Sequence, residues 1–209
     1  MSKRIRILIV DDHLALRIGL AAMLVSHRHL QVVAEAADVA GAIAACEKHG
    51  PHVVLMDLRI PGGGGVEATL AIRQRWPATR VLIVTTYDGD EDIHRAIQAG
   101  ASGYLLKGLT SAELIAAIEA LHRGEKVMQP NLAARFRERI LRKDLSSREL
   151  EVLRLIVAGR SNKEIARDLA IGEESVKSYL KAVFQKLGVA DRTQAAIEAI
   201  RHGIVHLNG

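Results

Sequence analysis

The sequence predicts an α/β domain followed by an all-α domain, and three features predict this architecture. Short apolar runs rich in β-branched residues alternate with amphipathic segments over residues 1–124, which is typical of a parallel sheet with helices on both faces. From residue 144 on, the apolar residues recur at helical spacing and no further strand pattern appears. Residues 125–143 contain a proline and a run of charges, which is typical of a linker. We therefore expect an α/β domain at 1–124, a linker at 125–143 and a helical domain at 144–209.

Five strands are expected in the first domain, each ending close to a polar or turn-forming residue: 4–10, 31–36, 53–56, 80–85 and 103–107. For five parallel strands with short connections, we expect the flavodoxin-like order 2-1-3-4-5. Capping residues and glycine stops mark the helices that follow the strands. Asp38 and Gly50 mark the second helix, and Ser111 and Gly124 mark the last.

Four short helices are expected in the second domain. Ser146 or its neighbour Ser147 caps the first, Ser161 caps the second, and the third extends from about 173 to 187. Thr193 is expected to cap the fourth, whose inward residues are Ala196, Ile197 and Ile200. A turn that contains glycine joins the second and third helices, and this arrangement indicates a helix-turn-helix motif.

The composition indicates a globular protein with an excess of positive charge. The 209-residue chain is 49% hydrophobic, carries a net charge of +5 and has a pI of about 9.6. The net charge is zero over 1–124, +4 over 125–143 and +1 over 144–209, so the excess lies in the linker. This balance makes nucleic acid or another anionic surface a plausible partner. Aromatic residues are only 3% of the chain, which argues against stacking on single-stranded bases.

The sequence favours a cytoplasmic location and no membrane segment. Its apolar runs are far shorter than a membrane span, and the apolar segment after the basic N-terminus is too short for a secretory signal. The single cysteine, Cys46, excludes an internal disulfide and fits a reducing compartment.

Acidic residues gather at the predicted carboxyl ends of the first and third strands. Asp11 and Asp12 follow the first strand, and Asp57 follows the buried run 53–56 and precedes a loop that begins with Pro61 and four glycines. Strands one and three are neighbours in the expected order, so these acids can share one pocket. Three carboxylates repel one another strongly, and Mg²⁺ suits such a sparse set of oxygen ligands. The simpler alternatives are a turn-forming aspartate and an N-cap pair.

Two further strand ends point to the same edge of the sheet. Thr85 supplies a hydroxyl group and Lys107 an ammonium group. With the acids they form the set needed for phosphoryl transfer to a carboxylate, in which Asp57 attacks in line. Mg²⁺, Lys107 and Thr85 would then bind the phosphoryl oxygens. The presence of each residue at its strand end also has an ordinary explanation. Threonine is favoured in strands, which would account for Thr85, and Lys107 could simply be a solvated residue at the end of its strand.

Five segments resemble those of a known family: LIVDDH at 8–13, VVLMDLRIP at 53–61, VLIVTTYD at 81–88, GASGYLLK at 100–107 and LSSRELEVLRLIVAGRSNKEIARDLAIGEESVKSYLKAVFQKLGVADRTQA at 145–195. The first four resemble the receiver domain of bacterial two-component response regulators. The last resembles the LuxR-type helix-turn-helix domain. Both together, in this order, resemble the NarL/FixJ class of response regulators over nearly the whole chain apart from the linker.

The resemblance implies a role for each residue of the acidic pocket. Asp57 would be the phosphate-accepting residue, and a partner histidine kinase would donate the phosphoryl group. Thr85 and Tyr104 would be the coupled switch pair, with the hydroxyl turning to the phosphoryl group and the ring following inward. Lys107 would pair with the phosphoryl oxygens. Mg²⁺ would be held by oxygen ligands from Asp11 (through water), Asp12, Asp57 and the main-chain carbonyl of Arg59.

The resemblance also makes the third helix of the second domain the DNA reader, while the second helix crosses the DNA backbone. The residues expected to reach bases are Lys177, Ser178 and Lys181, and those expected near phosphates are Ser161, Asn162, Lys163, Ser175, Tyr179 and Arg192. Tyr179 stands where the family usually has histidine. The ordinary alternative for each lysine is a solvated helix face. We expect a homodimer on double-stranded DNA, with the dimer contact made by the last helix, from Thr193 to His202.

Two other functions remain open. An aspartyl-phosphate hydrolase of the haloacid dehalogenase type also uses a strand-end aspartate with Mg²⁺, but it needs a second acid where this chain has Arg59. A phosphorylation-independent dimerisation module of a transcription factor would not need the intact acid set. We therefore expect a regulator whose only chemistry is its own phosphorylation and dephosphorylation, and not a turnover enzyme.

Overall fold

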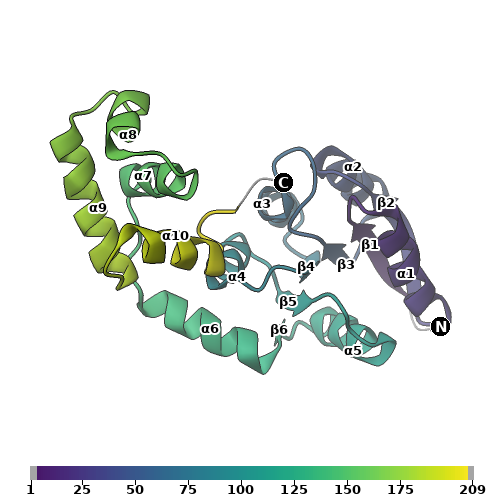
Figure 1. Cartoon of the computed structure of the whole chain (residues 1–209). Coiled ribbons are helices and arrows are strands. Elements are labelled where there is room, and N and C mark those ends of the chain that lie inside the picture. Colours follow the sequence, from purple (N-terminus) through teal and green to yellow (C-terminus); the bar gives the residue numbers. More distant parts are fainter. Residues whose placement is uncertain (1–3, 207–209) are drawn as a thin grey trace. The chain divides into compact units, whose positions relative to one another are not determined.

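The computed structural model describes residues 4–206 and is shown in Figure 1. Its contacts divide the chain into two compact units. The first contains the chain up to Asp88 together with Ile93–Ala133, and the second contains Gly89–Asp92 and the chain from Ala134 on. The finer division expected from the sequence, into 1–124, 125–143 and 144–209, stays a prediction.

Six strands form the sheet of the first unit: β1 (Ile5–Val10), β2 (Leu30–Ala36), β3 (Val53–Met56), β4 (Arg80–Thr85), β5 (Gly103–Leu106) and β6 (Val127–Met128). All neighbouring pairs are parallel, in the order β2-β1-β3-β4-β5-β6. The expected order 2-1-3-4-5 is confirmed. The sixth strand departs from the expectation of five, because it comes from the segment predicted as a linker. A two-residue strand is too short to leave a periodic pattern in the sequence.

Helices cover both faces of this sheet, as expected: α1 (Leu14–Val25), α2 (Val39–His49), α3 (Gly65–Arg75), α4 (Asp90–Gln98, of which the residues from Ile93 belong here) and α5 (Ser111–His122). Alternate residues of β1, namely Ile5, Ile7 and Ile9, share one core with the inner sides of α1 and α5. The helices α2 and α3 pack on the opposite face (Figure 1). Burial of both faces explains why the strands appear in the sequence as continuous apolar runs.

The second unit is helical: α6 (Pro130–Leu141, of which the residues from Ala134 belong here), α7 (Ser147–Val157), α8 (Asn162–Asp168), α9 (Glu173–Leu187) and α10 (Arg192–Arg201). Its core is formed by apolar residues of α7 to α10, among them Val152, Ile156, Ile165, Val176 and Val183. The helix α6 lies in the segment predicted as a linker. No helix in the described part of the chain is long and apolar enough to span a membrane.

Most helix ends follow the expected capping signals. Asp38 accepts the N–H of Gly41 at 2.7 Å, and Gly50 ends α2 in the left-handed conformation. Ser146 and Ser161 cap α7 and α8, each in a capping box with a glutamate three residues later. The sequence therefore determines these boundaries locally.

Two caps differ from the expectation. Thr110 rather than Ser111 caps α5, because a glutamate three residues after Thr110 completes a capping box with it. Asp191 rather than Thr193 caps α10, and its side chain accepts the N–H of Gln194. The last helix therefore begins earlier than its sequence pattern suggests.

The inward face of α10 also differs from the expectation. The buried residues are Ala195 and Ala199, which lie four apart on one side of the helix. Ile197 and Ile200, expected to point inward, are 57% and 40% exposed. The helix α10 therefore presents isoleucine side chains on its outer side.

Candidate functional sites

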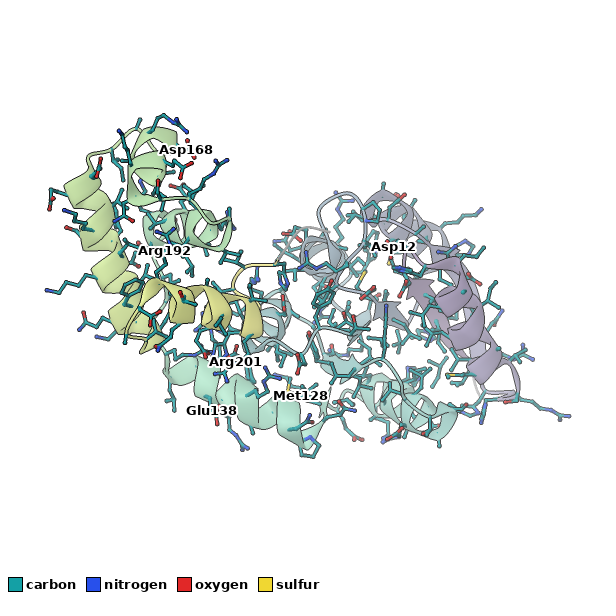
Figure 2. All side chains as sticks on the ribbon, in the orientation of Figure 1. Asp12, Met128, Glu138, Asp168, Arg192 and Arg201 are labelled. Carbon is teal, nitrogen blue, oxygen red and sulfur yellow. The ribbon has the colours of Figure 1, made fainter. Side chains whose placement is uncertain are left out.

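The register of the sheet brings the expected acids together. Val10 of β1 pairs with Met56 of β3, and the ladder continues as the N–H of Asp57 donates to the carbonyl of Val10 at 2.9 Å. Asp11 and Asp57 therefore lie at adjacent strand ends and are only 1% and 4% exposed. Asp12, labelled in Figure 2, is the more exposed neighbour, with 37% of its side chain accessible.

Lys107 lies between the two buried carboxylates. It follows β5, and its N–H donates to the carbonyl of Thr85 at the end of β4, at 2.7 Å. Its Nζ is 2.8 Å from Oδ2 of Asp11 and 2.8 Å from Oδ2 of Asp57. Burial lowers the pKa of Lys107, but the hydrogen bonds and charges of the two aspartates outweigh burial and raise it above its ordinary value. The ammonium group is thus held in its charged form and offsets part of the negative charge.

The acidic group has the donor set of a hard divalent cation. One ligand atom from each of Asp11, Asp12, His13 and Asp57 lies within 4.8 Å of the others, the one such group found among the described residues. Main-chain N–H groups hold the inner oxygens: Leu58 donates to Oδ1 of Asp57 at 2.7 Å, and His13 donates to Oδ1 of Asp11 at 2.9 Å. Clustered carboxylate oxygens with one side open to water are what Mg²⁺ prefers, so these residues fit that ion.

Thr85 and Tyr104, the expected switch pair, are linked through Tyr87. The N–H of Tyr87 donates to Oγ1 of Thr85 at 3.4 Å, and the hydroxyl of Tyr104 donates to the carbonyl of Tyr87 at 2.7 Å. Thr85 and Tyr104 are both fully buried. The ring of Tyr104 therefore already occupies the inward position that the resemblance assigns to the phosphorylated state.

The loop after Asp57 turns sharply and approaches the acceptor closely. Gly62–Gly64 all have positive φ, at 91°, 124° and 98°. A Cβ atom on Gly65 would lie 2.0 Å from the carbonyl oxygen of Asp57, so only glycine fits at this position. Within this loop the guanidinium carbon of Arg59 lies 4.8 Å from the ring centroid of Tyr87. The loop is therefore in contact with the segment that follows β4.

The helix α9 presents the expected base-contact residues to solvent. Its inner face consists of residues buried or partly buried in the core: Val176, Tyr179, Leu180 and Val183. Ser175, Lys177, Ser178 and Lys181 are exposed. Lys177 Nζ is 2.6 Å from Oε1 of Glu174, whereas Lys181 has no ion-pair partner among the described residues. The outer face of α9 is thus available to a partner, although Tyr179 is only partly accessible.

The remaining expected phosphate contacts gather where α8 and α10 begin. Arg192, labelled in Figure 2, donates to Oδ1 of Asn162 at 3.5 Å and also to the carbonyl of Arg160. The hydroxyl of Ser161 is 2.7 Å from a carboxylate oxygen of the glutamate with which it caps α8. Lys163 is exposed. Polar groups from two helices therefore meet here, and their contact with DNA stays a prediction.

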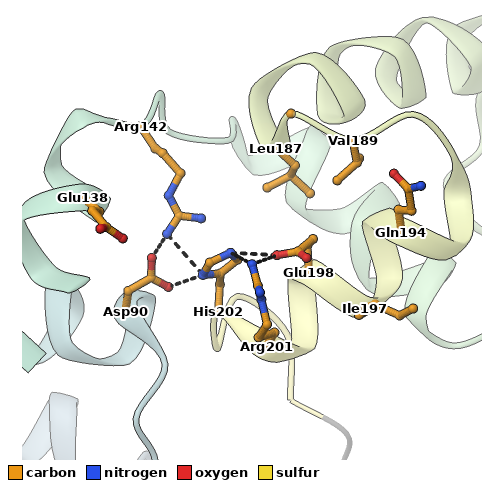
Figure 3. Close-up of a pocket in the computed structure, with 11 residues that line it drawn as sticks. Asp90, Glu138, Arg142, Leu187, Val189, Gln194, Ile197, Glu198, Arg201 and His202 are labelled. Atoms are coloured by element: carbon orange, nitrogen blue, oxygen red, sulfur yellow. Dashed lines mark hydrogen bonds and ion pairs between the residues drawn. The ribbon is translucent and has the colours of Figure 1, made fainter. Parts of the chain in front are cut away.

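A pocket in the second unit lies at the C-terminal end of α9, at the opposite end of the helix from Ser175 (Figure 3). Its lining includes Arg142 after α6, Glu198 and Arg201 of α10, and His202, which follows that helix. Glu198 of α10 pairs with Arg201 at 2.6 Å and with His202, just after the helix, at 2.8 Å. Burial and the charges of Arg142 and Arg201 lower the pKa of His202, more than Glu198 raises it. These charges pair within the pocket, so they do not indicate a ligand.

Two family patterns match the chain, in the order expected from the sequence. The family described as "Response regulator receiver domain" matches residues 7–119, and the family described as "Bacterial regulatory proteins, luxR family" matches residues 143–199. The chain belongs to the response regulators that combine these two domains. The receiver domain contains the acidic pocket, and the LuxR-type domain contains α9.

Similar proteins share both domains over almost their whole length. "Response regulator protein VraR" of Staphylococcus aureus is 36% identical over 206 residues, which cover 96% of this chain and 99% of that protein. The response regulator ChrA of a heme-sensing two-component system has 36% identity and a TM-score of 0.58, covering 98% of this chain and 100% of ChrA. RcsB from Salmonella enterica serovar Typhimurium, bound to a promoter with the phosphomimetic BeF₃⁻, has 26% identity and a TM-score of 0.73, covering 94% and 98%.

Sequence reasoning missed two residues of the receiver pocket. Nδ1 of His13 is 2.7 Å from Oδ1 of Asp12, and Tyr87 connects Thr85 to Tyr104. Each missed residue lies within two positions of a predicted strand end or of its acid. Both residues could therefore have been found by examining the two residues that follow each predicted strand end or its acid.

Proposed function

We propose that this protein is a phosphorylation-dependent transcription regulator in which Asp57 accepts a phosphoryl group. The observation that carries the proposal is the position of Lys107, 2.8 Å from carboxylate oxygens of both Asp11 and Asp57 at the carboxyl edge of the sheet. An acceptor carboxylate needs a fixed cation beside it, because a phosphoryl group brings a charge of about −1.5 to −2 at pH 7. The match of residues 7–119 to the receiver family supports the same assignment.

The proposed reaction is an in-line displacement at phosphorus. A carboxylate oxygen of Asp57 attacks and forms a new P–O bond, while the bond from phosphorus to the donor breaks and its electrons leave with the donor atom. Lys107 offsets the charge on the phosphoryl oxygens, and Thr85 can donate its hydroxyl to one of them. A divalent cation such as Mg²⁺, bound by the three acids and the main-chain carbonyl of Arg59, would supply further charge neutralisation. Family membership makes a sensor histidine kinase the physiological donor.

Labelling of the full chain with acetyl phosphate and Mg²⁺, followed by mass spectrometry, tests this assignment. The wild-type chain should gain one phosphoryl group and Asp57→Asn should gain none. Asp168→Asn, which removes an acid of α8, is the matched control and should be labelled like the wild type. Undiminished labelling of Asp57→Asn would identify another acceptor. Continuous turnover of a small phosphate ester would instead assign the chain to the hydrolases.

The second part of the proposal is that α9 reads double-stranded DNA and that the protein binds as a homodimer. The exposed Lys177, Ser178 and Lys181 lie away from the buried side of α9, and a helix of this kind enters the major groove in helix-turn-helix proteins. The RcsB relative was solved bound to a promoter. The isoleucines Ile197 and Ile200, exposed on α10, supply an apolar surface that a second copy can cover.

Selection of DNA from a random library with the phosphorylated chain tests this part. A symmetric site with a fixed half-site spacing is expected, because a symmetric dimer contacts two half-sites. Lys181→Ala should relax the preference at one base, by about 1–3 kcal/mol. A uniform loss across all sequences would instead place Lys181 on a phosphate. Equal DNA affinity with and without phosphodonor would contradict dependence on phosphorylation.

A further inference from the structure

An arginine of α1 is bonded to the main chain that carries the acid pair. Arg17 lies near the start of α1, and its Nη1 donates to the main-chain carbonyl of Asp11 at 2.7 Å. Its Nε is 3.3 Å from Oε2 of Glu35, which lies near the carboxyl end of β2. The side chain of Arg17 is only 14% exposed. The proposed chemistry does not use this residue, so the placement of its charged group needs another explanation.

Asp11 is held on both sides of its main chain. Its N–H donates to the carbonyl of Ala36 on β2 at 3.1 Å, just beyond the end of β1. Its carbonyl accepts from Arg17 and belongs to the peptide that joins Asp11 to Asp12. Because a peptide unit is planar, a fixed carbonyl also fixes the direction in which the chain enters Asp12. Arg17 therefore acts on both members of the acid pair through one bond.

The carboxylate of Asp12, labelled in Figure 2, has little support of its own. Its side chain is 37% exposed, and its ion-pair partner within the described part of the chain is Nδ1 of His13 at 2.7 Å, which is itself 72% exposed. The carboxylate of Asp11, by contrast, accepts the N–H of His13 and lies 2.8 Å from Nζ of Lys107. The direction of the Asp12 carboxylate therefore depends mainly on its main chain, which the bond from Arg17 holds.

We propose that Arg17 is a positioning residue for the divalent cation, and that Glu35 anchors Arg17 in this role. The bond to the Asp11 carbonyl keeps the ligand atoms of Asp11 and Asp12 close together, within 4.8 Å in the structure. This inference deepens the proposed function, because it takes Mg²⁺ as the ion that these acids bind. Residues that orient metal ligands without touching the metal commonly change its affinity about ten- to hundredfold. We expect a smaller effect here, about three- to tenfold, because Arg17 holds the main chain and not a carboxylate.

A purely electrostatic role for Arg17 predicts a change of the opposite sign. Its guanidinium is a positive charge close to the acid pair, and it repels a divalent cation bound there. Removal of that charge alone would strengthen cation binding. Removal of a positioning bond weakens binding, because the acids must then be ordered by the ion itself. The sign of the change therefore separates the two roles.

Mn²⁺ binding to the full chain without phosphodonor measures this change. Free Mn²⁺ is measured by its electron paramagnetic resonance signal, and displacement by Mg²⁺ gives the affinity for Mg²⁺. Arg17→Met should weaken the binding of both ions about three- to tenfold. Arg17→Lys keeps the charge but lacks the planar fork that contacts two oxygens, so it should also weaken binding. Arg28→Met removes an exposed guanidinium that follows α1, and this matched control should bind like the wild type.

Two substitutions of Glu35 separate its charge from its contact with Arg17. Glu35→Gln and Glu35→Ala both remove the negative charge, but glutamine keeps an oxygen that can accept from Nε of Arg17. Glu35→Ala should therefore weaken Mn²⁺ binding more than Glu35→Gln does. Arg17→Met combined with Glu35→Ala should bind no more weakly than Arg17→Met alone, because both substitutions remove the same support.

Labelling by acetyl phosphate gives a second readout that a general loss of structure would not produce. In Arg17→Met, the Mg²⁺ concentration at half the maximal labelling rate should rise by the same factor as the dissociation constant. The rate at saturating Mg²⁺ should stay at the wild-type level. Thermal unfolding in EDTA, followed by circular dichroism, verifies that each variant is folded, and the two Glu35 variants carry the test if Arg17→Met does not fold.

The outcomes separate this inference from the proposed function. Unchanged or stronger Mn²⁺ binding in folded Arg17→Met would overturn the positioning role and leave the acceptor assignment intact. Equal losses in Glu35→Gln and Glu35→Ala would overturn the anchoring role of Glu35, because charge alone would then explain them. Labelling of Asp57→Asn at the wild-type level would overturn the proposed function itself, whereas the binding of Mn²⁺ is measured without any phosphoryl transfer.

Discussion

Replacing Lys107 by methionine removes the ammonium group that lies between two buried carboxylates while keeping a side chain of similar length. The Nζ atom is 2.8 Å from both carboxylates, and Asp11 and Asp57 are 1% and 4% exposed. Neither acid can recover the lost interaction from water without a structural change. Breaking a buried ion pair by removing one partner costs about 3–5 kcal/mol, because an uncompensated charge stays buried.

One feature of the site reduces the expected loss. The side chain of Lys107 is itself 15% exposed, so its interactions are partly screened. Because the pKa of Lys107 is raised, its ammonium group is charged at pH 7 in the wild type. We expect Lys107→Met to lower the free energy of unfolding by about 2–4 kcal/mol at pH 7.

Urea unfolding in EDTA, followed by the fluorescence of Trp76, measures this loss. Trp76 is the single tryptophan of the chain and caps the C-terminal end of α3, so it reports on the receiver domain. Excess Mg²⁺ should recover more stability in Lys107→Met than in the wild type, because an ion bound by the acids no longer competes with an ammonium group. Lys48→Met, at an exposed position on α2, is the control and should change the free energy of unfolding by less than about 0.5 kcal/mol.

Wild-type stability of Lys107→Met in EDTA at pH 7 would refute this reasoning, since it would mean that the two carboxylates need no fixed cation. An equal loss in EDTA and in excess Mg²⁺ would refute the electrostatic origin of the effect. It would point instead to lost packing of the lysine side chain, which a cation bound by the acids does not restore.

Three further substitutions test the loop, the DNA surface and the second domain. Gly65→Ala places a methyl group 2.0 Å from the carbonyl oxygen of Asp57, so it should destabilise the receiver by about 1–3 kcal/mol and slow labelling by acetyl phosphate. Glu174→Gln releases Lys177 from a 2.6 Å ion pair and should raise DNA affinity by up to about fivefold in a binding titration. Glu149→Gln leaves a lysine of α9 without its 2.6 Å partner and should cost the second domain about 1–3 kcal/mol in thermal unfolding by circular dichroism. The pKa of Glu149 is lowered because its hydrogen bonds outweigh burial, so this loss should be seen at neutral pH and disappear in acid.

Each of these substitutions has a matched control. Gly19→Ala adds a methyl group in α1 with no atom within 4 Å and should leave labelling unchanged. Glu173→Gln removes the neighbouring charge of α9, and a gain in DNA affinity equal to that of Glu174→Gln would show that charge alone, not the ion pair, matters. Glu151→Gln removes a glutamate of the same helix, α7, that is more exposed, and a loss as large as that of Glu149→Gln would contradict the role of burial.

The sequence predicts the sheet well where both of its faces are covered. The strands β1, β3 and β4 are buried over nearly their whole length, so each appears as an uninterrupted apolar run between turn signals. The short β6 carries no such pattern and is formed by pairing with the edge of β5. On α10, apolar residues lie on both sides of the helix, and only packing determines that Ala195 and Ala199 are buried while Ile197 and Ile200 are exposed.

The positions at which the parallel strands end predict the charged residues of the pocket. They do not predict how the side chains of the neighbouring loop residues are oriented. Asp11, Asp57 and Lys107 are predictable because parallel register places successive strand ends at one edge. The contact between Arg59 and Tyr87 is not, because two exposed loop side chains can adopt many rotamers and no periodic pattern constrains them. Side-chain direction in loops depends on the assembled structure.

In the proposed function, the charge of the pocket explains how phosphorylation of Asp57 acts as a switch. Three carboxylates and the ammonium group of Lys107 give a formal charge of −2, which a bound divalent cation would cancel. Transfer then replaces the single charge of the Asp57 carboxylate by about −2, so the pocket becomes negative again beside the buried Asp11. Among the described residues, Lys107 Nζ is 2.8 Å from Oδ2 of Asp57 and the N–H of Leu58 donates to Oδ1 of Asp57 at 2.7 Å, so both can offset this charge. In the proposed function the hydroxyl of Thr85 is a further donor, and the N–H of Tyr87 donates to Oγ1 of that residue. The free energy available for switching is the difference between these interactions before and after transfer. Through Thr85 and Tyr87, this difference biases the position of the loop after β4.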